Sequence, residues 1–169
     1  MATQERSVFA VLPAAVLLFG LAVSPVFAAQ TTIKVDLWDR GAAVDMMTNM
    51  GMMMKPGMMA TEMAMAPMGI MISAATVSAG EITFDVTNTS KEVIHEMVVS
   101  PVSDPAGLPY DEQSSKVDED AAGHLGEVAE LDPGATGSLT LTFKPGTYIL
   151  YCNIPGHYAS GMWTLITVQ

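Results

Sequence analysis

The sequence is poor in cysteine and histidine. It has one cysteine, Cys152, and three histidines, His95, His124 and His157, among 169 residues. A single cysteine excludes a disulfide within the chain, so the core alone must hold the fold together. The length is sufficient for that, and it predicts a single domain. With so few thiols and imidazoles, each candidate ligand can be considered individually.

Positive charge is also scarce. Seven lysine and arginine residues stand against 18 aspartate and glutamate residues, which gives a net charge of −11. Nucleic-acid binding depends on basic side chains that neutralise phosphates, so the composition predicts a chain that does not bind nucleic acid. Attraction to a partner protein with a basic surface is the interpretation that this charge favours.

Long apolar runs are confined to the N-terminus. Residues 8–28 are almost wholly apolar and end in Val26-Phe27-Ala28, which resembles a cleavage site with small residues. We expect residues 1–28 to be a signal peptide that is removed after Ala28, which predicts a periplasmic or secreted protein. The alternative is an uncleaved membrane anchor, because the run is nearly long enough to span a bilayer. Pro13, Pro25 and the cleavage-like end favour removal.

Much of the remaining chain alternates apolar and polar residues, as β-strands do. In residues 31–39, Ile33, Val35 and Leu37 alternate with polar neighbours. Similar patterns predict strands at about 69–73, 81–87, 93–99, 138–143, 148–152 and 163–168. Turn residues such as glycine, proline and asparagine separate them. Several short strands with such turns predict an all-β sandwich or barrel.

Two segments do not follow this pattern. Residues 46–71 contain 12 methionines among 26 residues, and their glycines and prolines predict a loop or flexible insertion. Thioethers suit Cu(I), so extra copper binding is one hypothesis there, and an adaptable apolar surface is the other. Residues 103–132 are polar and acidic. They predict a long loop that is either solvated or a docking surface for a basic redox partner.

The most specific pattern lies near the C-terminus. Cys152, His157 and Met162 follow one another at intervals of five residues, with Pro155-Gly156 between the first two. A strand that enters a tight loop and returns as a strand can direct all three side chains to one point. A thiolate, two imidazoles and a weak axial thioether are the ligands of electron-transfer copper sites. Metal binding would also occupy a lone thiol in an oxidising compartment.

The second imidazole must come from elsewhere in the chain. His95 lies on an apolar strand, on the face that alternation directs inward, whereas His124 lies in the acidic region. His95 is therefore the better candidate, and we expect His124 to be exposed to solvent. The predicted metal ligands are His95, Cys152, His157 and Met162.

The run Cys152-Asn-Ile-Pro-Gly-His157-Tyr-Ala-Ser-Gly-Met162 resembles the ligand loop of the cupredoxins, especially rusticyanin-like and sulfocyanin-like members. Residues 92–99 resemble their upstream ligand strand, and residues 76–88 resemble the strand and turn before it. The resemblance covers about residues 70–169 and implies a Greek-key β-sandwich with one type 1 copper. The family often has asparagine after the upstream histidine, where this chain has Glu96. That difference leaves open how the two ligand segments are tied together.

The resemblance implies a one-electron carrier and not an enzyme, and the signal-peptide pattern of residues 1–28 predicts that this carrier is exported. Multicopper oxidases and copper nitrite reductases need several further histidines, and a dinuclear copper centre needs a second cysteine. The alternative function is copper storage or delivery, with residues 46–71 binding Cu(I).

We expect one domain, in which residues 29–72 add a strand and the methionine-rich segment to a cupredoxin core at 73–169. The expected protein is a monomer, and its expected partner is a redox protein such as a c-type cytochrome or an oxidase. Membrane contact is expected only if residues 1–28 are retained as an anchor.

Overall fold

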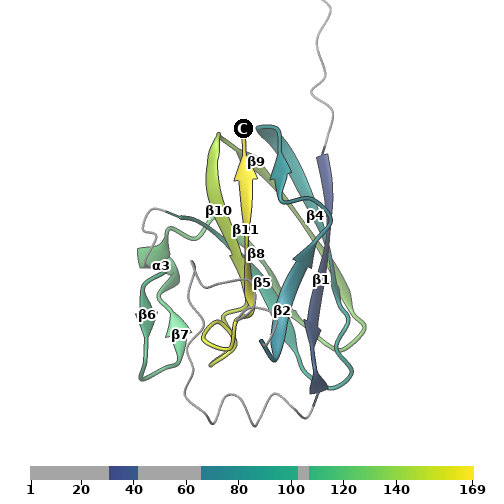
Figure 1. Cartoon of the computed structure of the whole chain (residues 1–169), viewed down its shortest axis with the longest axis vertical. Helices are drawn as coiled ribbons and strands as arrows, with labels where there is room; N and C mark the ends of the chain where they lie inside the picture. The colour runs from purple at the N-terminus through teal and green to yellow at the C-terminus, as the bar shows by residue number, and fades with distance from the viewer. Residues whose placement is uncertain (1–30, 42–65, 103–106) are drawn as a thin grey trace, which may run out of the picture.

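The computed structural model describes residues 31–41, 66–102 and 107–169. Within these ranges the chain forms three β-sheets, of which the two larger ones pack face to face (Figure 1) and the third has only two strands. One of the larger sheets has four strands in the order β2-β1-β4-β9, and the other has five in the order β3-β11-β10-β5-β8. The all-β sandwich that the alternating pattern predicts is confirmed.

The chain passes several times from one sheet to the other. The four-stranded sheet consists of β1 (Thr31–Asp39), β2 (Met68–Ile72), β4 (Gly80–Asn88) and β9 (Thr136–Phe143). The five-stranded sheet consists of β3 (Thr76–Val77), β5 (His95–Pro101), β8 (Gly126–Leu131), β10 (Gly146–Tyr151) and β11 (Trp163–Val168). After β4 the chain forms β5 and β8 in the second sheet and returns at β9 to pair with β4. This return is a Greek-key path.

The main core lies between the two sheets. The side chains of Ile33, Val35 and Leu37 point into it from β1, as their alternation predicts. Phe84 of β4 packs edge-on against Phe143 of β9, with ring centroids 5.8 Å apart. Full burial of one large apolar side chain contributes about 1.5–3 kcal/mol. A core of this kind explains how the sandwich is stable without a disulfide.

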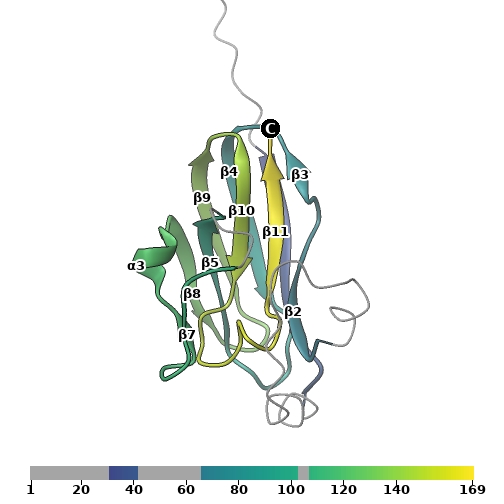
Figure 2. The ribbon, with the colours of Figure 1, turned by 60° about the vertical axis from the view of Figure 1, so that its left-hand side comes forward.

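A second, smaller core covers the outer face of the five-stranded sheet. The covering excursion contains β6 (Tyr110–Asp111), β7 (Lys116–Val117) and the short helix α3 (Glu119–Ala122), and it lies beside the sandwich in Figure 2. Tyr151, Tyr158 and Trp163 are buried in this second core. Because they are sequence neighbours of Cys152, His157 and Met162, the second core packs the predicted ligand loop from its outer side.

The predicted strand positions agree with the structure to within two residues, but the acidic region differs. Residues 103–132 were expected to be a loop, and β6, β7, α3 and β8 all lie there. β8 is an edge strand that pairs with β5, and Val128 is its one buried residue. Main-chain pairing makes it a strand, so its side chains show no apolar alternation for a sequence pattern to detect.

Residues 42–65 and 1–30 lie outside the described residues. The loop or Cu(I) site predicted for the methionine-rich segment, and the signal peptide, therefore stay predictions. The end of the methionine-rich segment is described, and it forms β2, in which Met68 is buried and Met71 is exposed. In the described part of the chain, no helix has the length and apolar character that crossing a membrane requires.

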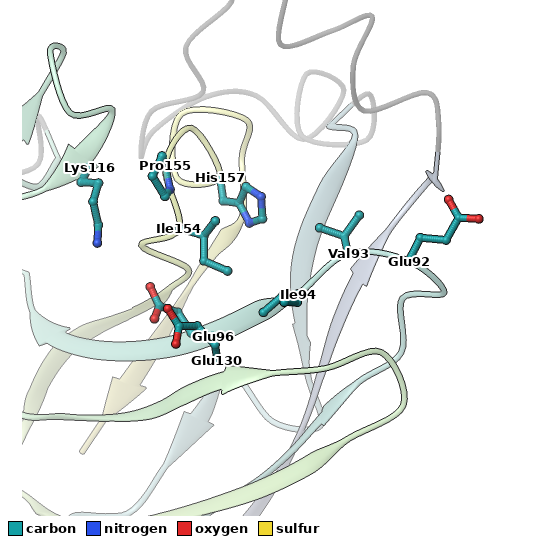
Figure 3. Close-up of a pocket in the computed structure, with 9 residues that line it drawn as sticks. All are labelled: Glu92, Val93, Ile94, Glu96, Lys116, Glu130, Ile154, Pro155 and His157. Atoms are coloured by element: carbon teal, nitrogen blue, oxygen red, sulfur yellow. The ribbon is translucent and has the colours of Figure 1, made fainter.

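An open groove lies beside the loop that joins β10 to β11 (Figure 3). Its apolar lining consists of Val93, Ile94, Ile154 and Pro155. His157, one of the predicted ligands, also lines the groove. The predicted metal site therefore adjoins a recessed surface.

Candidate metal centre

The predicted ligands come from two segments that meet at one end of the sandwich. His95 is the first residue of β5, and Cys152, His157 and Met162 belong to the loop between β10 and β11. β5 and β10 are paired neighbours in the five-stranded sheet. Their pairing brings the beginning of one strand close to the end of the other. The β10–β11 loop lies at the end of the sandwich away from the C-terminus (Figure 1).

Hydrogen bonds within the loop bring its residues together. The Cys152 amide donates to the Met162 carbonyl at 3.0 Å, which extends the pairing of β10 with β11. The Met162 amide donates to the His157 carbonyl at 3.1 Å. Gly156 and Gly161 have φ angles of 83° and 94°, in the left-handed region that favours glycine. These two glycines allow the tight turns by which residues five apart in sequence meet.

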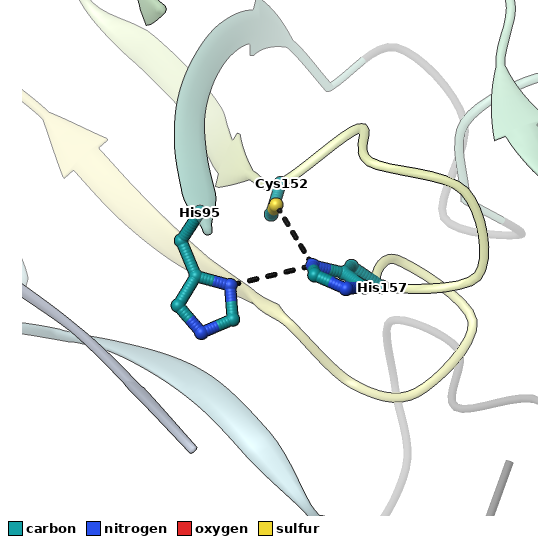
Figure 4. Close-up of side chains that lie close together, drawn as sticks. All are labelled: His95, Cys152 and His157. Atoms are coloured by element: carbon teal, nitrogen blue, oxygen red, sulfur yellow. Dashed lines mark hydrogen bonds between the residues drawn. The ribbon is translucent and has the colours of Figure 1, made fainter. Parts of the chain in front are cut away.

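Three donor atoms converge at this end of the sandwich (Figure 4). His157 Nδ1 lies 3.3 Å from His95 Nδ1 and 3.3 Å from Cys152 Sγ. Ligand atoms of the three residues all lie within 4.8 Å of one another. Met162 is fully buried in the same core cluster as Cys152. The structure therefore brings together the three strong donors that the sequence predicts, and it buries the thioether residue among the same core side chains.

Burial keeps the three groups uncharged in the metal-free protein. It raises the pKa of the Cys152 thiol to about 12, although the Glu96 backbone amide, 3.5 Å from the sulfur, acts in the opposite direction. It lowers the pKa of His157 to about 4, with a further contribution from neighbouring His95. Burial also lowers the pKa of His95, against the opposing effect of Asp39. Both imidazoles are therefore neutral at pH 7, as metal ligands must be.

The donor set fits a metal ion better than it fits hydrogen bonds alone. His157 Nδ1 faces both His95 Nδ1 and Cys152 Sγ. A ring nitrogen carries either one proton or one lone pair, so His157 Nδ1 cannot donate a hydrogen bond to both atoms. Donors bound at about 2.0–2.3 Å and about 120° apart would be separated by about 3.5–4.0 Å, slightly more than the 3.3 Å contacts seen here. Two imidazoles, a thiolate and a weak thioether suit copper in particular. The arrangement fits a single type 1 copper site.

Glu96 provides the tie between the ligand segments that the sequence left open. Its buried side-chain Oε1 accepts a hydrogen bond from the Asn153 backbone amide at 2.9 Å. Glu96 follows His95, and Asn153 follows Cys152, so this bond joins the two segments directly behind their donor atoms. Burial raises the pKa of the Glu96 carboxyl, and the Asn153 amide opposes that effect. The Glu96 carboxyl group therefore joins the two ligand segments at the position where the family often has asparagine.

Asn153 extends this tie to the excursion that covers the outer face of the sheet. Its Oδ1 accepts from the Val117 amide at 2.6 Å, and its Nδ2 donates to the Val117 carbonyl at 3.1 Å. Nδ2 also donates to Glu119 Oε1 at 2.7 Å. The side chain is almost fully buried, so few of these bonds can be replaced by water. Asn153 therefore links the ligand loop to β7 and α3.

Replacing Asn153 with alanine should destabilise the metal-free protein by about 3 kcal/mol. Three hydrogen bonds disappear, and the buried Val117 amide and carbonyl lose their side-chain partner. Urea unfolding followed by circular dichroism measures this difference in the free energy of unfolding. Glu112→Ala, in the exposed part of the same excursion, is the control and should change stability by less than about 0.5 kcal/mol. A similar small effect for Asn153→Ala would contradict the assigned network.

The structure places His124 as the sequence predicts, and it adds Asp39, which the sequence analysis did not identify. His124 lies at the surface, 3.9 Å from Glu119 and outside the group formed by His95, Cys152 and His157, as predicted. Asp39 was not predicted, yet its Oδ2 lies 3.2 Å from His95 Nε2. A signal was present, because Asp39 continues the inward-facing series of Ile33, Val35 and Leu37. A carboxylate at an inward position of a strand indicates a specific buried partner.

Comparison with known proteins agrees with this geometry. Residues 56–169, more than half of the chain, match the copper binding proteins of the plastocyanin/azurin family. Auracyanin-B of Chloroflexus aurantiacus is 44% identical over 50 residues, which are 29% of this chain. Those residues are 21% of that protein, so the match spans about a fifth of the relative's length.

Solved structures show the same fold. Rusticyanin from Thiobacillus ferrooxidans is similar with a TM-score of 0.52 at 16% identity, over 85% of this chain and 79% of that one. Auracyanin B is similar with a TM-score of 0.50 at 22% identity, over 83% of this chain and 89% of that one. Fold and donor set together define a protein with a mononuclear blue copper site. The chain belongs to the plastocyanin/azurin family of copper binding proteins, the cupredoxins. The resemblance found in the ligand loop is thereby confirmed.

Proposed function

We propose that this chain is a one-electron carrier in which His95, Cys152, His157 and, as a weak thioether donor, Met162 would hold a single copper ion. The observation that carries the proposal is the convergence of the chain's one thiol with two neutral imidazoles in a buried site. A bound copper ion would supply the change between Cu(II) and Cu(I).

The role of the protein is to hold the donors in place and to exclude water. His95 and Cys152 are fully buried; His95 begins β5, Cys152 directly follows β10, and these two strands are paired through their main chains. Donors that stay in place in both oxidation states keep the structural change on electron transfer small. His95 and Cys152 expose no surface that a substrate could contact, which supports a carrier and not an enzyme.

His157 offers the route by which an electron would leave. It is the least buried of the three strong donors and lines the groove together with Ile154 and Pro155 (Figure 3). Ile94, on the opposite wall, is 43% exposed. An apolar surface at the ligand edge allows a partner to approach closely and displace water.

The partner that we propose is a redox protein with a basic docking surface, such as a c-type cytochrome or an oxidase. Glu92 and Glu130 are exposed at the groove, and the whole chain carries a net charge of −11. Opposite charge on the partner would accelerate encounter at low salt. Export to the periplasm or the cell exterior is part of the same proposal, and residues 1–28 support it by their signal-peptide pattern.

Copper loading tests the proposed function. The mature chain should bind one copper per molecule and, when oxidised, show an intense visible band from thiolate-to-copper charge transfer. Metal analysis after gel filtration and an absorption spectrum measure both. A copper-loaded, oxidised sample without that band would refute the proposal. His124→Ala removes a surface imidazole outside the site, so it should leave both results unchanged and controls for loosely bound copper.

Deleting residues 46–65 separates the carrier from a copper storage or delivery protein. The deletion ends before β2, which begins at Met68 and pairs with β1. A carrier keeps one copper per chain after this deletion. A storage protein would bind more than one Cu(I) before the deletion and lose the excess after it.

A further inference from the structure

Asp39 contacts Nε2 of the His95 ring, and the other ring nitrogen, Nδ1, faces His157. Its Oδ2 lies 3.2 Å from His95 Nε2, and the two side chains are 3% and 0% exposed. Its other oxygen, Oδ1, accepts a hydrogen bond from the Gly41 amide. Both oxygens are therefore used, and the carboxylate is fixed in the direction of the imidazole. Asp39 ends β1, in the opposite sheet from His95, so the contact also joins the two sheets at the metal-site end.

The contact determines which nitrogen of His95 carries the proton. An ionised carboxylate only accepts hydrogen bonds, so Nε2 must be the donor. The neutral ring then has its lone pair on Nδ1, which is the nitrogen that faces His157. Asp39 thus presents His95 in the tautomer that a metal ion requires.

A buried carboxylate also has an electrostatic effect. Burying an unpaired charge is costly unless a positive charge lies opposite to it. A cation bound at His95 Nδ1 would supply that positive charge across the ring, and the doubly charged ion would benefit more than the singly charged one. The attraction is strong because solvent does not reach this pair and cannot screen it.

We propose that Asp39 is a positioning residue that sets the tautomer of His95 and lowers the reduction potential of the copper site by favouring Cu(II) over Cu(I). This inference rests on the proposed function, because it assumes that His95 is a copper ligand.

Asp39→Asn tests both parts, with Asp36→Asn as the matched control. Asp36 lies on the same strand but on its other face, so Asp36→Asn removes an equal charge away from His95. In Asp39→Asn, the amide oxygen still meets the Gly41 amide, and the NH₂ group then faces His95 Nε2. Nitrogen NMR of the metal-free protein should show the His95 proton moving from Nε2 to Nδ1.

The potential of the copper-loaded protein provides the second readout. Loss of a partner behind a metal-bound histidine typically weakens metal affinity by about 10–100-fold. We expect Asp39→Asn to weaken Cu(II) binding about tenfold more than Cu(I) binding, which raises a one-electron potential by about 59 mV. The difference should persist at high salt, because Asp39 is buried. Asp39→Glu, which keeps a carboxylate, should restore the potential toward the wild-type value.

An Asp39→Asn protein whose His95 tautomer and potential both match those of Asp36→Asn would overturn the inference. Failure of the proposed function gives a different result, since the wild-type protein itself would then lack the intense visible band.

Discussion

Replacing Cys152 with serine should abolish the intense visible band of the copper-loaded protein. The chain has one cysteine, so no second thiolate can take over the charge transfer. A serine hydroxyl is a poor ligand at neutral pH, and the two imidazoles alone do not form a blue site. We expect complete loss of the band and a marked loss of Cu(II) affinity, measured by absorption spectroscopy and by competition with a chelator.

Met97→Leu is the matched control for this variant. Met97 is a fully buried methionine on β5, two residues from His95, and it packs in the main core. Exchange of methionine for leucine keeps the volume and typically costs less than about 1.5 kcal/mol. The Met97→Leu protein should therefore keep the band. Retention of the band in Cys152→Ser would show that the assignment of the thiolate is wrong.

In the metal-free protein, the Cys152 thiol should react with iodoacetamide about a thousandfold more slowly than in the denatured chain. Burial raises its pKa from 9.0 to about 12, and thiolate is the reactive form, so the reactive fraction at pH 8 falls by about three powers of ten. The complete burial of the side chain adds a barrier to access. Mass spectrometry of alkylated chains over time, with and without urea, measures the ratio.

An added surface thiol provides the internal reference. Ser114 is exposed in the excursion beyond β6, so the new cysteine of Ser114→Cys should be alkylated at the rate of an ordinary thiol while Cys152 is protected. Equal rates at both positions would contradict the buried, neutral thiol.

The raised pKa of Cys152 also predicts that the stability of the metal-free protein depends on pH. The native state keeps this proton where the unfolded chain loses it, so stability falls as the pH rises from 9.0 towards 12.

The strands that bury one face could be predicted, because apolar and polar side chains alternate along them. Ile33, Val35 and Leu37 mark β1 by alternation, and the predicted range 31–39 is the observed one. The strand β8 was not predictable in this way, because it lies at a sheet edge and buries Val128 alone. An edge strand is defined by main-chain hydrogen bonds to its neighbour, and such bonds leave no pattern in the side chains.

The candidate site was predictable to a similar extent. The intervals between Cys152, His157 and Met162 are local, and a single loop whose glycines permit tight turns brings these residues together. His95 was the better of two remaining histidines on the basis of strand alternation. Its place beside the loop depends on the pairing of β5 with β10, which joins residues 47 to 53 positions apart.

By itself, the sequence determined the fold class and the chemical identity of the site, because strand alternation and the loop spacing are properties of short segments. The tertiary structure alone decided what surrounds the donors. Asp39 behind His95, and Glu96 bonded to Asn153, bring together residues 56 and 57 positions apart. Such partners are set by how the two sheets pack and by which strands are neighbours. Strand alternation marks Asp39 as inward-facing, but no local pattern identifies its partner, because the free energy of that arrangement comes from the whole core.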